Sequence, residues 1–180
     1  GTLDPMAEGV LLVLLGKATK KQSQLTGLKK EYIARFRMGE RTDTQDATGT
    51  VLEKNSRVPG SIEIIKRAAE SFTGEIFQAP PMFSALRHKG VRLYKLARKG
   101  VEVPREKRRI IVYRIDVLSY EDSTAEFFVR CSKGTYIRTL GADIALAAGS
   151  CAVMTGLKRV SCGDYSLSDA LTRGDIEKMK

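Results

Sequence analysis

The sequence predicts an α+β fold built on a largely antiparallel sheet. The expected strands and helices do not alternate regularly, which argues against a doubly wound sheet, and several strands follow one another directly. An apolar fraction of 42% is that of an ordinary globular protein. A length of 180 residues suits one domain with a sizeable core, or a domain with a small additional lobe.

The first part of the chain contains two candidate strands separated by a short helix. The apolar run at residues 10–15 is bounded by glycines and fits a buried strand, and residues 18–25 are expected to form the helix. Residues 32–38 are the second strand, which a glycine ends. The polar stretch 41–49 is expected to be a loop, and residues 50–53 a short strand.

The middle and end of the chain carry clearer start and stop signals. Ser61 is suited to cap a helix, with Glu63 in the first turn, and Gly74 supplies the stop. The apolar residues of this helix recur at helical spacing, at Ile62, Ile65, Ala69 and Phe72. The other expected elements are an extended connector at 79–81, a helix at 93–99, paired strands at 110–118 and 125–131 around a turn at 121–123, a helix at 139–148 and a last strand at 154–160.

The charge balance indicates a polyanionic partner. Lys and Arg number 31 against 21 Asp and Glu, which gives a net charge of +10. Basic side chains that replace phosphate counterions gain affinity through counterion release. An RNA-binding protein is therefore favoured over a soluble protein that happens to be basic. The basic stretches at 87–89, 92–99 and 105–109 fit this interpretation together, although each alone is typical of a solvated face. No apolar run is long enough for a membrane span, and no signal peptide is recognisable.

The residue types available for chemistry are restricted. The three cysteines are an odd number without a Cys-x-x-Cys pair, which fits a reducing cytoplasm, and His88 is the only histidine. A zinc site and a Ser-His-Asp triad are therefore disfavoured. The acids of the 41–46 loop fail the calcium-loop spacing, so no metal is expected and their hydrogen bonds should go to a substrate or to the loop itself. The remaining candidates are carboxylates, tyrosines and arginines.

Asp4 is the first candidate catalytic residue. Pro5 removes a backbone donor and holds Asp4 in an extended conformation, which places the carboxylate on a stiff loop. An Asp-Pro pair is also an ordinary turn signal, and taken alone the turn is the more common explanation.

A second cluster follows a predicted strand at Ser132-Lys133-Gly134-Thr135-Tyr136-Ile137-Arg138. In an extended segment Tyr136 and Arg138 point to the same side, and an arginine beside a carboxylate keeps it ionised and orients it. A surface turn with a structural tyrosine explains the cluster equally well. Tyr32 follows basic residues and is suited to stack on a base, although a tyrosine facing the core at the start of a strand is more common.

These motifs occur together, and in this order, in one family. The chain carries Gly1-Thr2-Leu3-Asp4-Pro5-Met6-Ala7-Glu8-Gly9, Lys30-Glu31-Tyr32, Arg41-Thr42-Asp43-Thr44, Ser84-Ala85 with Gly90, Leu93 and Tyr94, and Lys133-Gly134-Thr135-Tyr136-Ile137-Arg138. From Gly1 to about Leu171 it resembles the bacterial TruB-type tRNA pseudouridine synthases, whose relatives are the guide-RNA-dependent enzymes of the dyskerin type.

The resemblance implies a fold, a reaction and a partner. The fold is the pseudouridine synthase fold, a curved, mixed, mostly antiparallel sheet flanked by helices with a catalytic cleft across its middle. The reaction converts a uridine in the T-loop of tRNA (position 55) to pseudouridine, and it needs no cofactor because reactant and product have the same composition and redox state. The target base has to be extracted from the stacked loop before it can react.

The resemblance also implies a role for each matching residue. Asp4 matches the catalytic aspartate, which acts as a nucleophile at the sugar or base, or helps to form a glycal-like intermediate. The substrate-binding residues implied are Arg138, which pairs with the aspartate, Tyr32, which stacks on the flipped base, Tyr136 and Leu157 in the uracil pocket, and Asp43, an acid near the substrate.

The ends of the chain and the oligomeric state complete the expectations. Residues 1–180 are expected to be one catalytic domain that lacks the family's N-terminal segment and any C-terminal RNA-binding module, in a cytoplasmic monomer. The alternative function is a non-catalytic RNA-binding or RNA-folding module on the same scaffold, which does not need the Asp4 carboxylate. A metal-dependent nuclease is disfavoured because only Asp43 and Asp46 share one loop.

Overall fold

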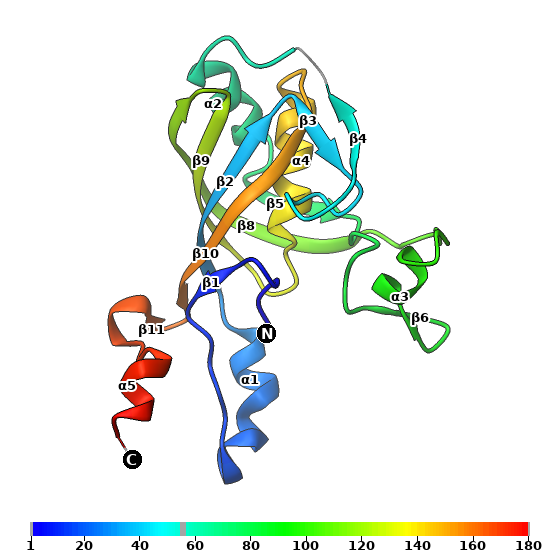
Figure 1. Ribbon diagram of the computed structural model, residues 1–180. Helices are drawn as coiled ribbons and strands as arrows, with labels where there is room; N and C mark the ends of the chain where they lie inside the picture. Colours follow the sequence, from blue (N-terminus) through cyan, green and yellow to red (C-terminus); the bar gives the residue numbers. More distant parts are fainter. Residues whose placement is uncertain (1, 55–56, 180) are drawn as a thin grey trace.

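The main sheet of the molecule is mixed and almost entirely antiparallel. The computed structural model describes residues 2–54 and 57–179. Its seven-stranded sheet has the order β1-β10-β2-β9-β8-β5, with β11 paired to β10, and only the pairing of β1 with β10 is parallel (Figure 1). The strands are β1 (Glu8–Gly9), β2 (Lys30–Met38), β5 (Gly74–Gln78), β8 (Arg108–Glu121), β9 (Thr124–Cys131), β10 (Ala152–Cys162) and β11 (Tyr165–Ser166). The predicted α+β class is confirmed.

Two helices cover one face of this sheet and close the core. Helix α2 (Ile62–Glu70) packs against β8 and helix α4 (Ile137–Ala147) against β10, and the two helices also contact each other (Figure 1). Strand β2 alternates over its second half, with Ala34, Phe36 and Met38 buried between exposed arginines. The rings of Phe36 and Phe127 meet edge to face at 5.7 Å. This core gives the sheet a rigid inner face from which site residues can project.

Gly141, inside α4, allows the helix to approach the sheet closely. A Cβ atom at this position would lie 2.1 Å from the ring of Phe36. We expect Gly141→Ala to lower the free energy of unfolding by about 1–3 kcal/mol, because the well-packed Phe36 ring has to be displaced. Urea denaturation measures the change.

The matched control for Gly141→Ala is Gly174→Ala in the short helix α5 (Arg173–Glu177). There an added Cβ meets nothing nearer than 3.7 Å, so alanine is expected to leave stability unchanged or to raise it slightly. Equal urea midpoints for the two variants would contradict the close packing of α4 on Phe36.

Smaller elements surround the sheet. Strands β3 (Glu40–Thr42) and β4 (Val51–Lys54) form a hairpin at one end of β2. Strands β6 (Arg87–His88) and β7 (Val91–Arg92) with helix α3 (Leu93–Ala97) form a projection, called the arm here and comprising residues 86–100 (Figure 1). The remaining helices are η1 (Gly16–Lys21), α1 (Gln22–Gly27) and η2 (Leu167–Asp169), and α1 and α5 extend away from the sheet. In the described ranges, no helix combines the length and the apolar content needed to cross a bilayer.

Most of the expected elements are confirmed. The strands predicted at 32–38, 50–53, 110–118, 125–131 and 154–160 are present as β2, β4, β8, β9 and β10, and the helices predicted at 18–25, 62–72, 93–99 and 139–148 as η1 with α1, α2, α3 and α4. The turn between β8 and β9 uses Asp122 and Ser123 at positive φ, the backbone that a two-residue hairpin turn requires.

The strand predicted at 10–15 is wrong. The strand of this region is Glu8–Gly9. Residues 10–15 have no regular secondary structure, and η1 begins directly after them at Gly16. Val10 is buried, but Leu11, Val13 and Leu15 are exposed, so most of the apolar run lies outside the core. A short apolar run without periodicity does not show whether it pairs with another strand, which explains the wrong prediction. The expected loop at 41–49 begins inside β3, and β5, β11 and the β6–β7 hairpin were not predicted.

Candidate active site

One cavity collects all six residues that the sequence singled out. An open cavity of about 920 Å³ is lined by Asp4, Tyr32, Asp43, Tyr136, Arg138 and Leu157. These residues come from the N-terminal segment, β2, the β3–β4 connection, the start of α4 and β10. The cavity therefore lies where segments distant in sequence meet. In the part of the chain that the structure describes, no three Asp, Glu, His or Cys side chains are arranged to hold a metal ion.

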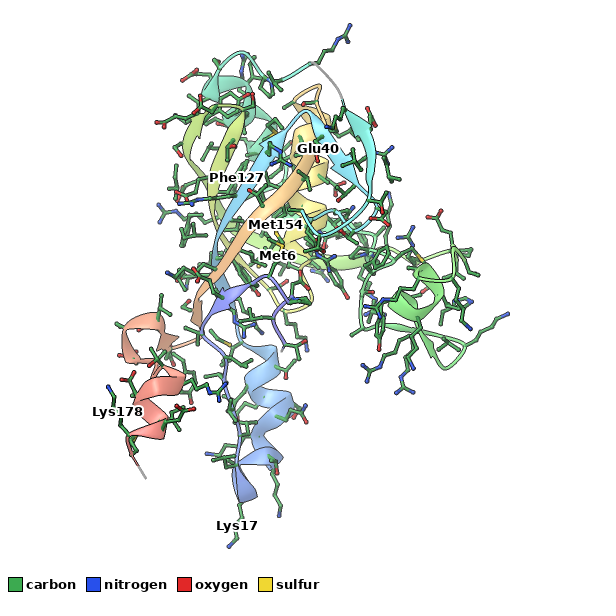
Figure 2. All side chains as sticks on the ribbon, viewed as in Figure 1. Met6, Lys17, Glu40, Phe127, Met154 and Lys178 are labelled. Carbon is green, nitrogen blue, oxygen red and sulfur yellow. The ribbon has the colours of Figure 1, made fainter. Side chains whose placement is uncertain are left out.

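The segment that carries Asp4 is anchored to the sheet. The backbone turns after Asp4, where the Ala7 N–H donates to the Asp4 carbonyl at 2.9 Å. Met6 packs against the core that contains Met154 of β10, and both side chains are marked in Figure 2. Gly9 has a φ of +105° and lies so close to β10 that a Cβ atom would be 2.2 Å from the Arg159 carbonyl oxygen. Only glycine is compatible with this approach.

Asp4 and Arg138 form a two-point ion pair at the floor of the cavity. Arg138 Nε lies 2.8 Å from Asp4 Oδ2, and Nη2 lies 3.3 Å from Oδ1. The Arg138 side chain is 6% exposed, whereas that of Asp4 is 32% exposed. A paired guanidinium fixes the orientation of a carboxylate more tightly than a single contact can. The carboxylate is thus held on one side by a buried cation and is open to the cavity on the other.

The remaining donors of Arg138 are also occupied. Nη1 donates to the Thr44 carbonyl at 2.7 Å, and Nη2 donates to the Phe83 carbonyl at 2.9 Å. Nη1 also lies 3.5 Å from Asp46 Oδ2. A guanidinium has five N–H groups in a fixed planar fork, and here its three nitrogens reach four partners. This network makes Arg138 a rigid support and leaves little capacity for a further ligand.

Asp46 is a site residue that was not singled out. Its side chain is 7% exposed and shares Arg138 with Asp4. Asp46 Oδ1 accepts hydrogen bonds from Thr44 Oγ1 at 2.8 Å, from Thr48 Oγ1 at 2.6 Å and from the Thr48 N–H at 3.0 Å. The two acids of this loop were noted in the sequence, but nothing local distinguishes the one that reaches Arg138.

Asp43, the acid that was singled out, has a different environment. Asp43 Oδ1 accepts from the Thr50 N–H at 2.8 Å, across the turn between β3 and β4. Gly49 packs against it so closely that a Cβ atom would lie 2.3 Å from the same oxygen. Asp43 lines the cavity but is committed to the loop backbone, which fits the expectation of hydrogen bonding within the loop.

Tyr136 and Arg138 do not lie in an extended segment, so that expectation is wrong. Tyr136 is the N-cap of α4 and Arg138 lies in the first helical turn. Gln78, buried at the end of β5, donates through Nε2 to the Tyr136 carbonyl at 3.0 Å and accepts from the Tyr136 N–H at 2.8 Å. This double contact from β5 fixes the start of the helix that carries Arg138.

Tyr32 and Leu157 face the cavity from neighbouring strands. In the β2–β10 pairing Tyr32 lies opposite Arg159, and Leu157 lies opposite Ala34. Burial raises the pKa of Tyr32 to about 12, and a hydrogen bond from the buried Arg159 side chain opposes this rise. The phenol is therefore protonated at neutral pH. Arg159 also donates through Nε to the Val10 carbonyl at 2.7 Å, so it links the N-terminal segment to the tyrosine. The sequence offered no signal for this second arginine.

The fold and the cavity together define a pseudouridine synthase domain. A chain from the crystal structure of a Cbf5-Nop10-Gar1 complex superposes with a TM-score of 0.68 at 33% identity, covering 92% of this chain and 40% of that one. A chain from the structure of an H/ACA RNP bound to a substrate RNA containing 2′-deoxyuridine superposes with a TM-score of 0.63 at 30% identity, covering 92% and 38%.

The chain belongs to the TruB family. The sequence profile of the TruB family pseudouridylate synthase N-terminal domain matches residues 1–137. The tRNA pseudouridine synthase B of Chromobacterium violaceum is 45% identical over 99% of this chain and 58% of its own length. Those of Clostridium tetani and Chromohalobacter salexigens are 46% and 50% identical, and the match covers 99% and 95% of this chain but only 62% and 55% of theirs. The chain thus spans little more than half the length of these relatives.

Proposed function

We propose that this chain is the catalytic domain of a tRNA pseudouridine synthase that converts the uridine at position 55 of the tRNA T-loop to pseudouridine. The observation that carries the proposal is the Asp4–Arg138 ion pair, open to a cavity that also contains Tyr32. The choice of tRNA as the substrate is supported by the names of the bacterial relatives, which are tRNA pseudouridine synthases B. The isomerisation leaves composition and redox state unchanged, so the side chains of the cavity have only to bind, detach and reattach one base.

Asp4 is the catalytic group in this proposal. Its carboxylate acts as a nucleophile at the sugar or the base, or assists formation of a glycal-like intermediate. Arg138 orients it through the two-point ion pair, and Asp46 holds Arg138 from the opposite side. The preorganised pair needs no rearrangement when the nucleotide arrives, which is how fixed charges lower a barrier.

The other cavity residues bind the flipped base. Tyr32 stacks on the uracil and, being protonated, offers a hydroxyl for hydrogen bonding or proton transfer. Leu157 and Tyr136 bound the pocket, and Asp43 shapes the loop beside it. Stacking and pocket contacts offset the few kcal/mol needed to extract a base from the T-loop.

Tyr32→Ala is expected to lower the rate of pseudouridine formation by about 5- to 150-fold, since stacking of one base contributes roughly 1–3 kcal/mol. Single-turnover kinetics with a T-loop RNA measure this loss. Tyr32→Phe is the matched control because it keeps the ring and removes only the hydroxyl that Arg159 contacts. A rate for Tyr32→Ala equal to that of the unmodified protein would remove Tyr32 from the site.

The basic arm supports an RNA substrate. It borders the cavity through Tyr94, Ala97 and Arg98, and it carries further lysines and arginines on its exposed turns. With the net charge of +10, these side chains provide phosphate contacts around the catalytic carboxylate. We propose a cytoplasmic monomer, a setting that fits the three free cysteines.

The direct test is incubation with an unmodified tRNA transcript, followed by chemical mapping of pseudouridine. Formation of pseudouridine at position 55 alone is expected. A transcript that stays unmodified although the protein binds it would favour the alternative, a non-catalytic RNA-binding or RNA-folding module. Modification of other uridines only would contradict the proposed target.

A further inference from the structure

Ser84 has a buried hydroxyl without a partner at the edge of the cavity. The residue is 6% exposed, and Ser84 Oγ makes no hydrogen bond to any residue that the structure describes. It is the one buried side-chain polar atom in residues 2–54 and 57–179 left in this state. Buried hydroxyls are almost always paired in folded proteins, and an unpaired one costs stability. We therefore expect this hydroxyl to form its hydrogen bond with a ligand when the protein binds one.

The backbone around Ser84 is fully engaged and holds the residue beside the catalytic pair. The Ser84 N–H donates to the Met82 carbonyl at 2.9 Å, and the Ser84 carbonyl accepts from the Tyr94 N–H at 3.1 Å. The preceding carbonyl, that of Phe83, accepts from Arg138 Nη2 at 2.9 Å. Ser84 thus directly follows the residue whose carbonyl binds the Arg138 guanidinium, the group that holds Asp4. The backbone groups of Ser84 are hydrogen-bonded, and only its side-chain hydroxyl is unused.

The cavity that Ser84 lines also contains an exposed arginine. Ser84, Tyr94 and Arg98 all line it, and the Arg98 guanidinium lies 5.5 Å from the centre of the Tyr94 ring. Among the described residues, no carboxylate pairs with Arg98. The buried cations among the described lining residues already have partners: Lys30 donates to the Thr26 and Leu28 carbonyls, Arg138 is saturated, and Arg159 donates to the Val10 carbonyl. A hydroxyl donor and a guanidinium without a carboxylate partner, both lining one cavity, are suited to a phosphate group.

We propose that Ser84 is a substrate-contact residue whose hydroxyl donates to a phosphodiester oxygen of the RNA adjoining the target uridine. The contact requires a χ1 rotation of Ser84 that turns the buried hydroxyl toward the cavity. The contact positions the flipped nucleotide relative to Asp4, with Arg98 neutralising the phosphate from the same wall. This inference rests on the proposed function, since it assigns a contact to the same RNA substrate.

The test compares Ser84→Ala with a serine whose hydroxyl is paired. Ser150 is equally buried, and its Oγ donates to the Arg57 carbonyl at 2.7 Å. Ser84→Ala is expected to leave the melting temperature unchanged or higher, whereas kcat/KM falls and the dissociation constant for T-loop RNA rises, each by about 3- to 10-fold, the size of one hydrogen bond. Ser150→Ala is expected to do the reverse, with a lower melting temperature and unchanged kinetics.

Modified RNAs identify the acceptor. T-loop RNAs with a single methylphosphonate either 5′ or 3′ of the target uridine lack one charged phosphate each. With one of them, Ser84→Ala and the unmodified protein are expected to bind equally, because the partner of the hydroxyl is already gone. The assignment would be overturned if Ser84→Ala and the protein without substitutions bound and converted RNA without a methylphosphonate equally well. It would also be overturned if the Ser84→Ala variant showed its full defect on both methylphosphonate RNAs. If the protein without substitutions binds T-loop RNA but forms no pseudouridine, the proposed function is contradicted. The Ser84 proposal is still tested in that case, because the dissociation constants of the two proteins can still be compared.

Discussion

Replacing Asp4 by asparagine is expected to abolish pseudouridine formation, with a loss of at least about a thousandfold in single-turnover rate, typical of removing a catalytic nucleophile. Asparagine has the same shape but no negative charge, so it can neither attack the nucleotide nor form the ion pair with Arg138. The fold is expected to persist because Arg138 keeps the Asp46 carboxylate at 3.5 Å and its carbonyl partners. Binding of T-loop RNA should survive, since the proposed phosphate contacts are made by basic side chains and not by Asp4.

The matched control for this prediction is Asp164→Asn. Asp164 is exposed in the turn between β10 and β11, and the substitution removes the same charge away from the cavity. Its rate and RNA affinity are expected to equal those of the unmodified protein. If Asp4→Asn retained full activity, the catalytic assignment of Asp4 would be wrong. The non-catalytic RNA-binding alternative would instead be supported if the protein without any substitution bound T-loop RNA but did not modify it.

Replacing Arg138 by lysine is expected to have the second largest effect, a loss of about a hundredfold or more in rate, comparable to removing one preorganised charge donor. A lysine ammonium has three donors on a flexible stem and cannot pair with Asp4 at two points while also reaching the Thr44 and Phe83 carbonyls. Buried acceptors left without partners are also expected to lower the free energy of unfolding by about 1–3 kcal/mol. Single-turnover kinetics and urea denaturation measure the two effects.

Arg35→Lys is the control for Arg138→Lys. Arg35 pairs with Glu126 at 2.7 Å, but its side chain is 65% exposed on the outer face of the sheet. An exposed ion pair contributes at most about 1 kcal/mol, so this substitution is expected to leave both rate and stability almost unchanged. Equal effects of the two substitutions would contradict the view that the buried network around Arg138 orients Asp4.

The elements that the sequence predicted correctly are those with local signals. Strand β2 and the β8–β9 hairpin show alternation or turn residues, and α2 shows helical spacing between a cap and a glycine. The wrong strand at 10–15 and the undetected β5 lack such signals. Residues 10–15 are apolar without periodicity, and β5 is a five-residue edge strand whose identity depends on pairing with β8.

The site residues divide in the same way. Asp4, Tyr32 and Arg138 were found because they lie in motifs that resemble those of the TruB family, and all of them line the cavity. Asp46, Gln78 and Arg159 were missed because their roles come from partners elsewhere in the fold. Gln78 binds the backbone of a residue 58 positions away, and the Arg159 contact with Val10 spans 149 positions.

Periodicity, composition and short motifs were enough to predict the fold class, most of the helices and strands, the basic character of the protein and its likeness to one family. The three-dimensional structure was needed to show which carboxylates share Arg138, how Gln78 holds Tyr136 at the start of α4, and that the Ser84 hydroxyl is buried without a partner. These contacts join residues that are far apart along the chain. Asp4 and Arg138 are 134 residues apart, and packing brings them together although the residues around each of them do not indicate the other.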